Sequence, residues 1–297
     1  MDAAVKSPIE MFYQWEKTTP NKVFLRQPTN LVWAEFTWAQ IGDQVRRLTT
    51  FIDKQNYPPG SRIAIWSSNS MDWVVVDLAI MMSGHVSVPV YPGQDLKSAR
   101  YILEHSESQM IFLGAFDHAA DADEAIPDSV TRVGIHGATT PCAYQLKDIL
   151  ANNEPRQDSP IPDPEGMMTM VYTSGTTGNP KGVIHVHSTA GHTLPKTIAR
   201  MLRDSPQPVF FSFLPLSHVA ERVVVEFVCL YSNGVISFSE GLATFAAELR
   251  SVQPTLFFAV PRLWLKFKEG VDAKIPPAMH AHLTEEQKFG IRQMLGL

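Results

Sequence analysis

Hydroxyl, glycine and lysine residues cluster in the segment 172–182, Tyr-Thr-Ser-Gly-Thr-Thr-Gly-Asn-Pro-Lys-Gly, directly after the apolar run 167–171. Hydroxyl and backbone N–H groups can donate hydrogen bonds to anionic oxygens, and Lys181 adds a mobile positive charge. The glycines let the backbone approach a ligand closely. This composition predicts a triphosphate-binding loop rather than a solvated linker. The candidate nucleotide-binding residues are Thr173, Ser174, Gly175, Thr176, Thr177, Gly178 and Lys181.

The loop departs from the Walker A motif, in which the lysine follows a glycine and precedes a serine or threonine. Here Asn179 and Pro180 separate Gly178 from Lys181, and the residue after the lysine is Gly182. No hydroxyl therefore stands where that motif places its Mg²⁺ ligand. Kinase or GTPase chemistry of the Walker type is a poor fit to this sequence.

A second chemically informative segment, 211–222, reads Phe-Ser-Phe-Leu-Pro-Leu-Ser-His-Val-Ala-Glu-Arg. The apolar residues predict a strand closed by the proline, and a helix is expected to begin near Ser217. Ser217 is the expected N-cap, because serine hydroxyls accept hydrogen bonds from the first backbone N–H groups of a helix. His218 lies at the junction, where a histidine is structural more often than chemical.

These two segments resemble known motifs. The string 172–182 resembles the phosphate loop of the acyl-adenylate-forming superfamily, which contains acyl-CoA synthetases, luciferases and peptide-synthetase adenylation domains. The segment 214–222 resembles the Leu-Pro-Leu-x-His-x-x-Glu-Arg segment of long-chain fatty acyl-CoA synthetases. The resemblance implies that His218 is a catalytic residue lining the acyl-adenylate pocket, and makes Arg222 a candidate substrate-binding residue. Some bacterial relatives have a tryptophan gate where Arg222 stands, so no such gate is expected here.

A third segment, 254–264, is rich in aromatic residues and is expected to form a strand ending at Pro261-Arg262. It resembles the Val-Pro-Arg segment of the same family. Arg262 is either an anchor for a phosphate or carboxylate group or a residue that pairs locally at the strand end. We keep it as a candidate substrate-binding residue.

Strands and helices alternate along the first half of the sequence. A buried strand is expected at 62–66, followed by a helix that Asn69 or Ser70 caps and that stops at Gly84. Further strands are expected at 86–92 and 109–113, with a helix at 98–107 between them. Alternation at these spacings predicts right-handed parallel α/β layers.

The proline-rich stretch 152–165 reads as a linker between two α/β lobes. We expect residues 1–155 to form the first lobe and residues 156–297 the second lobe, which carries the phosphate loop. The resemblance implies an acyl-CoA synthetase-like large N-terminal domain with layered α/β lobes and mostly parallel sheets, incomplete at its C-terminal end. It also implies that a mobile C-terminal domain of the family is absent from these residues.

Composition excludes several function classes. Apolar residues make up 44% and charged residues 19% of the chain, which is enough for a large core. The net charge of -5 gives no reason to expect nucleic acid as a partner. Cys142 and Cys229 show no metal or redox spacing, and the N-terminus has no apolar signal core. We expect a cytoplasmic protein, and a lipid-soluble substrate is compatible with peripheral contact at the inner face of a membrane.

The resemblance implies the N-terminal part of a long-chain fatty-acid–CoA ligase, an acid–thiol ligase. ATP with Mg²⁺ activates a fatty acid to an acyl-adenylate, and CoA then accepts the acyl group; Thr176 is the candidate Mg²⁺ ligand. The family's later Tyr-Gly-x-Thr-Glu motif is not found in the sequence, so we expect this part alone to be inactive. The alternatives are another adenylating enzyme (an aryl-acid ligase, a peptide-synthetase domain or a carboxylic acid reductase) or a non-catalytic nucleotide- or acyl-binding module.

Overall fold

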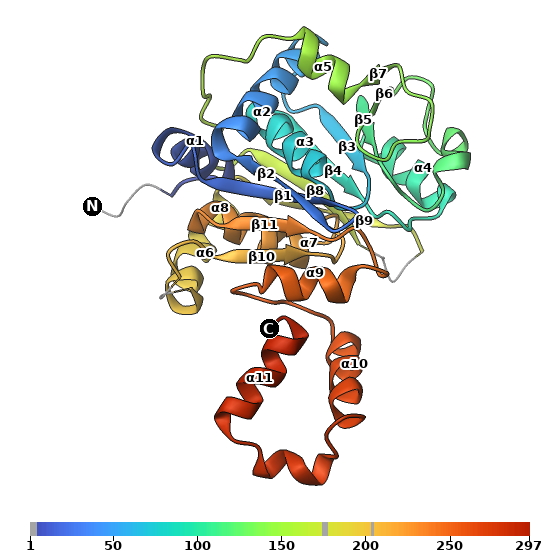
Figure 1. The fold of residues 1–297 in the computed structure, drawn as a ribbon. Helices are drawn as coiled ribbons and strands as arrows, with labels where there is room; N and C mark the ends of the chain where they lie inside the picture. The colour runs from blue at the N-terminus through green and yellow to red at the C-terminus, as the bar shows by residue number, and fades with distance from the viewer. Residues whose placement is uncertain (1–4, 174–177, 203–204) are drawn as a thin grey trace.

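Two β-sheets with helices packed between and around them form the body of the molecule (Figure 1). The computed structural model describes residues 5–173, 178–202 and 205–297. The larger sheet has the strand order β7-β6-β5-β3-β4-β8-β9, and the smaller has the order β10-β11-β1-β2. The strands are β1 (Val23–Thr29), β2 (Val32–Thr37), β3 (Arg62–Trp66), β4 (Val86–Val90), β5 (Met110–Leu113), β6 (Thr131–Gly134), β7 (Tyr144–Gln145), β8 (Met167–Thr173), β9 (Lys181–Val186), β10 (Val209–Ser212) and β11 (Val235–Phe238).

The helices connect these strands and cover both sheets. They are α1 (Pro8–Thr18), α2 (Trp38–Asp53), α3 (Met71–Met82), α4 (Leu96–His105), α5 (Leu146–Asn152), α6 (Ser188–Met201), α7 (Val219–Glu221), α8 (Val228–Ser232), α9 (Phe245–Val252), α10 (Pro261–Asp272) and α11 (Glu285–Leu295). Two short 3₁₀ helices, η1 (Ala119–Glu124) and η3 (Pro277–His282), and one π-helix, η2 (Arg222–Phe227), complete the set.

Helix α3 joins the two sheets. It is apolar around its circumference, and every residue from Trp73 to Met82 is buried. It packs against β3 and β4 of the larger sheet and against β1 of the smaller one. A helix with no polar face can be stable only when it is enclosed in this way. The central core therefore runs continuously from one sheet to the other.

The expected alternation of strands and helices is confirmed in the first half of the chain. Ser70 caps α3 by accepting a hydrogen bond from Trp73 N at 3.3 Å, and Gly84 has a φ of 72° just beyond the helix end. Strand β3 pairs in parallel with both β4 and β5. The parallel α/β fold class expected from the sequence is thus present.

The expected boundary at residue 155 does not separate the two sheets. Strands β1 and β2 belong to the smaller sheet with β10 and β11, whereas β8 and β9 complete the larger sheet. The reason is the parallel pairing of Leu25 with Ile236, which places the beginning of the chain beside a strand far along the sequence. The predicted linker 152–165 begins at the last residue of α5, Asn152, and its remaining residues are free of helix and strand.

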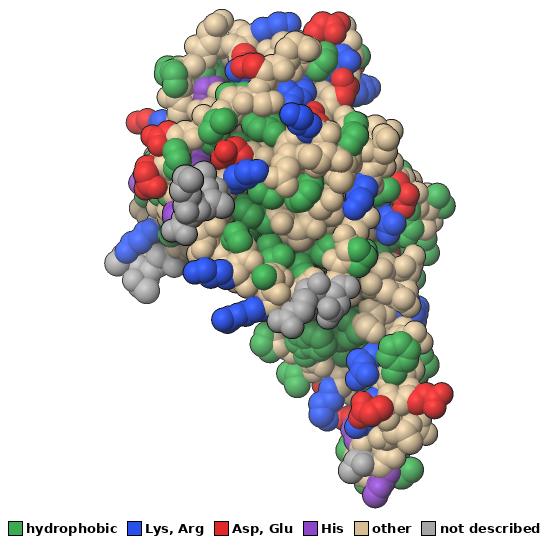
Figure 2. All heavy atoms as spheres, turned by 90° about the vertical axis from the view of Figure 1, so that its left-hand side faces the viewer, with side chains coloured by type: hydrophobic (Ala, Val, Ile, Leu, Met, Phe, Trp, Pro, Cys, Tyr) green, Lys and Arg blue, Asp and Glu red, His purple; other side chains and the backbone are tan. Residues whose placement is uncertain are grey.

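The segment 254–260 is also not a regular strand. Leu256 forms a single parallel bridge with Phe210, and a helix, α10, begins at Pro261. Helix α10 extends away from the body and α11 returns toward α9 (Figure 1), and neither has a buried side chain within the described part of the chain. Figure 2 shows this arm from the side, with apolar side chains exposed on it. They include Trp264, Leu265, Met279, Phe289 and Met294.

None of the helices within the described residues is long and apolar enough to cross a membrane.

Arg46 of α2 fastens the irregular stretch 153–166 to the body. Its Nε and Nη2 donate to the Glu16 carboxylate at 2.7 and 2.6 Å. Its Nη1 donates to the carbonyl oxygens of Arg156 and Asp158 at 3.1 and 2.9 Å. One guanidinium thereby satisfies backbone acceptors that have no strand or helix of their own to pair with.

We expect Arg46→Ala to lower the free energy of unfolding by about 1–3 kcal/mol, because it leaves Glu16 and two carbonyl groups without their donor. Urea denaturation followed by tryptophan fluorescence measures the change. Arg100→Ala is the matched control, since Arg100 pairs with Glu104 on an exposed helix face, where such pairs contribute about 0.5 kcal/mol or less. Equal losses in the two variants would contradict the role given to Arg46.

Candidate active site

The ends of the phosphate loop meet at the β8–β9 hairpin. Thr173, the last residue of β8, pairs directly with Lys181, the first residue of β9, and both are exposed. Residues directly opposite in an antiparallel pair project from the same face. Gly178 has a φ of 106°, a conformation that favours glycine. The structure therefore brings Thr173 and Lys181 together, and Gly178 lies three residues before Lys181. Ser174, Gly175, Thr176 and Thr177 lie outside the described residues.

The strand that enters the loop is held by a residue that sequence reasoning missed. His105, the last residue of α4, lies 2.7 Å from the Tyr172 hydroxyl through its Nδ1. Burial raises the pKa of Tyr172 to about 12, so its phenol stays protonated at neutral pH. Opposite Tyr172, a Cβ on Gly182 would lie 2.8 Å from side-chain atoms of Met170, so Met170 would have to move to admit a side chain there. No motif marks His105, since the packing of α4 alone brings it here.

His218 projects from the turn between β10 and α7. It is exposed, and its Nδ1 accepts a hydrogen bond from Ala220 N at 3.2 Å. His218 is thus the N-cap of α7, and the expectation that Ser217 caps this helix is wrong. His218 has extended backbone angles, as N-cap residues require. Because Nδ1 is the acceptor, Nε2 carries the N–H of the neutral ring and can donate to an anionic oxygen.

Buried polar side chains fix the turn that carries His218. Glu221 Oε1 accepts hydrogen bonds from Ser212 Oγ at 3.2 Å and from Phe213 N at 3.1 Å. Asn69 Oδ1 accepts from Leu216 N at 2.9 Å. Asn69 was one of two expected helix caps, but its side chain braces this turn instead. The backbone around His218 is therefore anchored on both sides.

The other two candidate residues lie in different surroundings. Arg222 begins η2 and is 2% exposed, with its guanidinium bound to the Asp77 carboxylate at 2.6 Å. Arg262 lies in the first turn of α10 and is exposed. The charge of Arg222 is already paired with that of Asp77 inside the protein. Contact of Arg222 or of Arg262 with a substrate remains a prediction.

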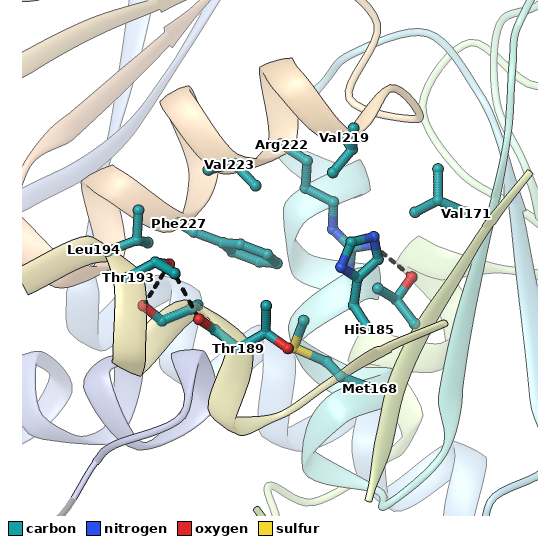
Figure 3. A pocket seen from close by; sticks show the side chains of 12 residues that line it. Met168, Val171, His185, Thr189, Thr193, Leu194, Val219, Arg222, Val223 and Phe227 are labelled. Carbon is teal, nitrogen blue, oxygen red and sulfur yellow. Dashed lines mark hydrogen bonds between the residues drawn. The ribbon is translucent and has the colours of Figure 1, made fainter. Parts of the chain in front are cut away.

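A small apolar cavity of about 50 Å³ lies beside the phosphate loop (Figure 3). Strands β8 and β9, helix α6 and the segment 219–227 enclose it. Val171 reaches it from two residues before Thr173, and Val219 from the residue after His218. The π-helical turn of η2 is a feature that recurs at functional sites. The lining residues are Met168, Thr169, Val171, His185, Thr189, Ala190, Thr193, Leu194, Val219, Arg222, Val223 and Phe227.

A larger cavity of about 670 Å³ opens where strands of both sheets end. Tyr91 follows β4, Ser212 ends β10, and Ser239 follows β11, so carboxyl ends of parallel strands surround it. This edge is where open α/β sheets bind ligands. Asp117 and Glu240 are its acidic lining residues, and carboxyl groups do not suit a triphosphate. The hydroxyl groups and ammonium of the β8–β9 loop fit a triphosphate better.

Within the described ranges, no group of three or more His, Cys, Asp or Glu side chains could hold a metal ion. Mg²⁺ in nucleotide sites is bound by few protein ligands and by substrate phosphates, so a nucleotide-borne ion fits this loop. The candidate ligand Thr176 lies outside the described residues.

The parallel α/β fold, with a β8–β9 loop rich in hydroxyl groups, glycine and lysine, agrees with the fold that the sequence predicts for an adenylate-forming enzyme. The family model described as "AMP-binding enzyme" matches residues 12–295, and the chain belongs to this family. The chain is 26% identical over 268 residues to the long-chain-fatty-acid–CoA ligase FadD15 of Mycobacterium bovis, covering 86% of this chain and 44% of that protein. It is 29% identical over 226 residues to fatty acyl-CoA synthetase A of Dictyostelium discoideum, covering 71% and 33%.

Solved structures confirm the expected fold. A benzoate CoA ligase from Burkholderia xenovorans LB400 superposes with a TM-score of 0.76 at 17% identity, covering 87% of this chain and 51% of that chain. VinN in complex with L-aspartate gives a TM-score of 0.74 at 17% identity, covering 97% and 73%. The chain spans less than half the length of these curated relatives, 44% and 33%.

We expect Glu221→Gln to remove a pH dependence of stability. Burial raises the pKa of Glu221 from 4.5 to about 8, against the opposing effect of its hydrogen bonds from Phe213 and Ser212. The folded protein therefore keeps a proton that the unfolded chain releases as the pH rises above 4.5. This contribution to stability is complete below pH 4.5 and is lost as the pH rises through 8.

Urea denaturation at intervals from about pH 5 to about pH 8 measures this slope. The glutamine amide retains an oxygen acceptor but cannot ionise, so its slope is expected to be flatter than that of the wild type. Glu104→Gln, on an exposed face of α4, serves as the control and should keep the wild-type slope. Identical slopes for wild type and Glu221→Gln would contradict a protonated Glu221.

Proposed function

We propose that this chain provides the nucleotide- and acyl-binding part of a long-chain fatty-acid–CoA ligase. The observation that carries the proposal is the course of β8: Val171 lines the apolar cavity, and Thr173 begins the phosphate loop two residues later. One strand thus leads from a site for an alkyl group to a site for a triphosphate. The curated relatives bear names of fatty acyl-CoA ligases, which supports the same substrate class.

The proposed reaction has two steps. A carboxylate oxygen of the fatty acid forms a bond to the α-phosphorus of ATP, and the bond to the bridging oxygen of the β-phosphate breaks, releasing pyrophosphate. The sulfur of CoA, as thiolate, then attacks the acyl carbon, and the carbon–oxygen bond to AMP breaks. Mg²⁺ bound with the nucleotide would neutralise phosphate charge. The residues of this chain have to align two anions that repel each other and to stabilise the departing pyrophosphate.

The residues of the site have distinct roles in this proposal. Lys181 and the Thr173 hydroxyl would hold the β- and γ-phosphates at the mouth of the loop, together with Ser174, Thr176 and Thr177. His218 would donate its Nε2–H to an oxygen of the carboxylate or of the acyl-adenylate. Such donors act most strongly where water is excluded, and the apolar lining beside Val219 favours that exclusion.

The cavity would have to expand to hold a long acyl chain, because its free volume is only about 50 Å³. Helix α6 is the element best able to move. Pro195 lies inside it and removes a backbone hydrogen bond. We propose that α6 and η2 separate as the chain enters. A cytoplasmic location with peripheral contact at the inner face of a membrane is part of the proposal, since long-chain fatty acids partition into lipid.

We expect Lys181→Ala to lower the rate of fatty-acid-dependent ATP–pyrophosphate exchange by at least about tenfold, the cost of losing one charged contact at a developing anion. The assay uses the protein expressed from its complete gene. Lys268→Ala, at an exposed position on α10, is the control and should retain wild-type exchange. Unchanged exchange in Lys181→Ala would remove the loop lysine from the mechanism.

A panel of acids in the same exchange assay tests the substrate class. Palmitate is expected to support exchange, and benzoate and amino acids are expected to support it at least about tenfold less, because the lining favours flexible alkyl groups that lose water on binding. Preference for benzoate or for an amino acid would favour another adenylating enzyme. Tight ATP binding in calorimetry without exchange for any acid would favour a non-catalytic binding module.

A further inference from the structure

Arg222 carries its positive charge in the interior of the protein. Its side chain is 2% exposed, and Asp77 is 0% exposed. Arg222 Nη2 donates to the two carboxylate oxygens of Asp77 at 2.7 and 2.6 Å, and Nη1 donates to Thr169 Oγ1 at 2.6 Å. A guanidinium without water is tolerated only where partners replace its hydration. The neighbouring groups of Arg222 therefore have fixed positions relative to one another.

These contacts join three segments whose relative positions matter for the proposed reaction. Thr169 lies on β8, four residues before Thr173, and its hydroxyl also donates to the Ser87 carbonyl oxygen at 2.7 Å. Asp77 lies in the middle of α3, the helix between the sheets. The backbone N–H of Arg222 donates to the His218 carbonyl oxygen at 3.1 Å. One side chain thus links the strand of the phosphate loop, the central helix and the helical turn after His218.

We propose that Arg222 is a positioning residue of the adenylation site, which holds the phosphate-loop strand and the His218 turn in one register through Thr169 and Asp77. This inference rests on the proposed function, because the register matters only if both segments act on the same reaction. It differs from the role suggested by the sequence, in which Arg222 contacts the substrate. The Asp77 carboxylate already accepts the hydrogen bonds that Arg222 Nη2 donates.

Of the two buried carboxyl groups beside Arg222, that of Asp77 is the nearer. Glu226 is also fully buried, with Oε2 at 3.4 Å from Arg222 Nε. Neither Glu226 oxygen has a hydrogen-bond partner among the described residues. Burial, and then the nearby charge of Asp77, hold the pKa of Glu226 well above its usual range. Asp77, whose two oxygens lie 2.7 and 2.6 Å from Arg222 Nη2, is therefore the hydrogen-bonding partner of the guanidinium, and the raised pKa of Glu226 favours its protonated form.

The same guanidinium forms part of the cavity wall (Figure 3). Phe227 follows Arg222 by five residues, the spacing of a π-helical turn, and its ring centroid lies 5.2 Å from Arg222 Cζ. His185 of β9 lines the cavity next to it, and burial, with a smaller effect of Arg222, lowers the pKa of that histidine. A neutral His185 leaves the pairing of Arg222 with Asp77 undisturbed. The contacts of Arg222 thus position both the wall of the apolar cavity and the strand that leads into the phosphate loop.

A pair of near-isosteric substitutions tests the proposal in the protein expressed from its complete gene. Glu226→Gln replaces a carboxyl that makes no hydrogen bond to Arg222 by an amide of nearly the same shape, and we expect kcat and KM for exchange to stay within about twofold of wild type. Asp77→Asn removes the charge that holds Arg222, and we expect kcat to fall at least about tenfold, with KM for the fatty acid changed less than about threefold. Thr169→Val breaks the link to β8 without changing any charge, and a similar fall in kcat is expected even where Asp77→Asn does not fold.

Three results would overturn the proposal. A raised KM for the fatty acid with unchanged kcat in Thr169→Val and Asp77→Asn would make Arg222 a substrate-binding residue instead. If both variants keep the wild-type kcat and KM and only their free energy of unfolding is lowered, the role of Arg222 is purely structural. Equal losses in Glu226→Gln and Asp77→Asn would contradict the assignment of Asp77 as the residue that holds Arg222. If the wild type prefers another carboxylic acid, the long-chain proposal fails, while the same variants assayed with that acid still decide the role of Arg222.

Discussion

The removal of Arg222 from water is the constraint on which much of this structure depends. A buried guanidinium needs a carboxylate and further hydrogen-bond acceptors as partners, because nothing else compensates for the water that it loses. Asp77 on α3 and Thr169 on β8 satisfy this need, and both belong to elements that contact neighbouring strands or helices. The apolar surroundings of α3 strengthen the interaction, since a low local dielectric reduces screening. Packing and charge pairing therefore fix the same geometry.

The parts of the site that depend on local sequence could be predicted, and the parts that depend on distant contacts could not. The order of hydroxyl, glycine and lysine residues at 172–182, directly after an apolar run, suffices to indicate a loop that follows a strand, whereas β9 on its other side was not expected. The pairing of Arg222 with Asp77, and of Tyr172 with His105, joins residues 145 and 67 positions apart, and no pattern in a single sequence reports such contacts. Ser217 was expected as the cap because serine is the better capping residue, yet the bracing of the turn by Glu221 and Asn69 places His218 at that position.

The same distinction between local sequence and distant contacts applies to the fold. Alternating apolar and polar segments were enough to predict the parallel strands β3, β4 and β5. The assignment of β1 and β2 to the smaller sheet could not be foreseen, because it requires a strand more than 200 residues later in the sequence. Membership of the AMP-binding enzyme family, by contrast, is already indicated by short sequence motifs. Motifs of this kind reflect ligand chemistry, whereas sheet order reflects the whole chain.

The pairing of β1 with β11 has a consequence for the synthesis of this protein on the ribosome. The N-terminal hairpin of β1 and β2 can form early, but the outer side of β1 receives its partner only after Val235–Phe238 has been translated. At about 5–20 residues per second, the unpaired edge persists for on the order of ten seconds or more. An edge strand with free N–H and C=O groups is a template for wrong association. Conditions that slow translation between these two strands are therefore expected to increase the demand for chaperones.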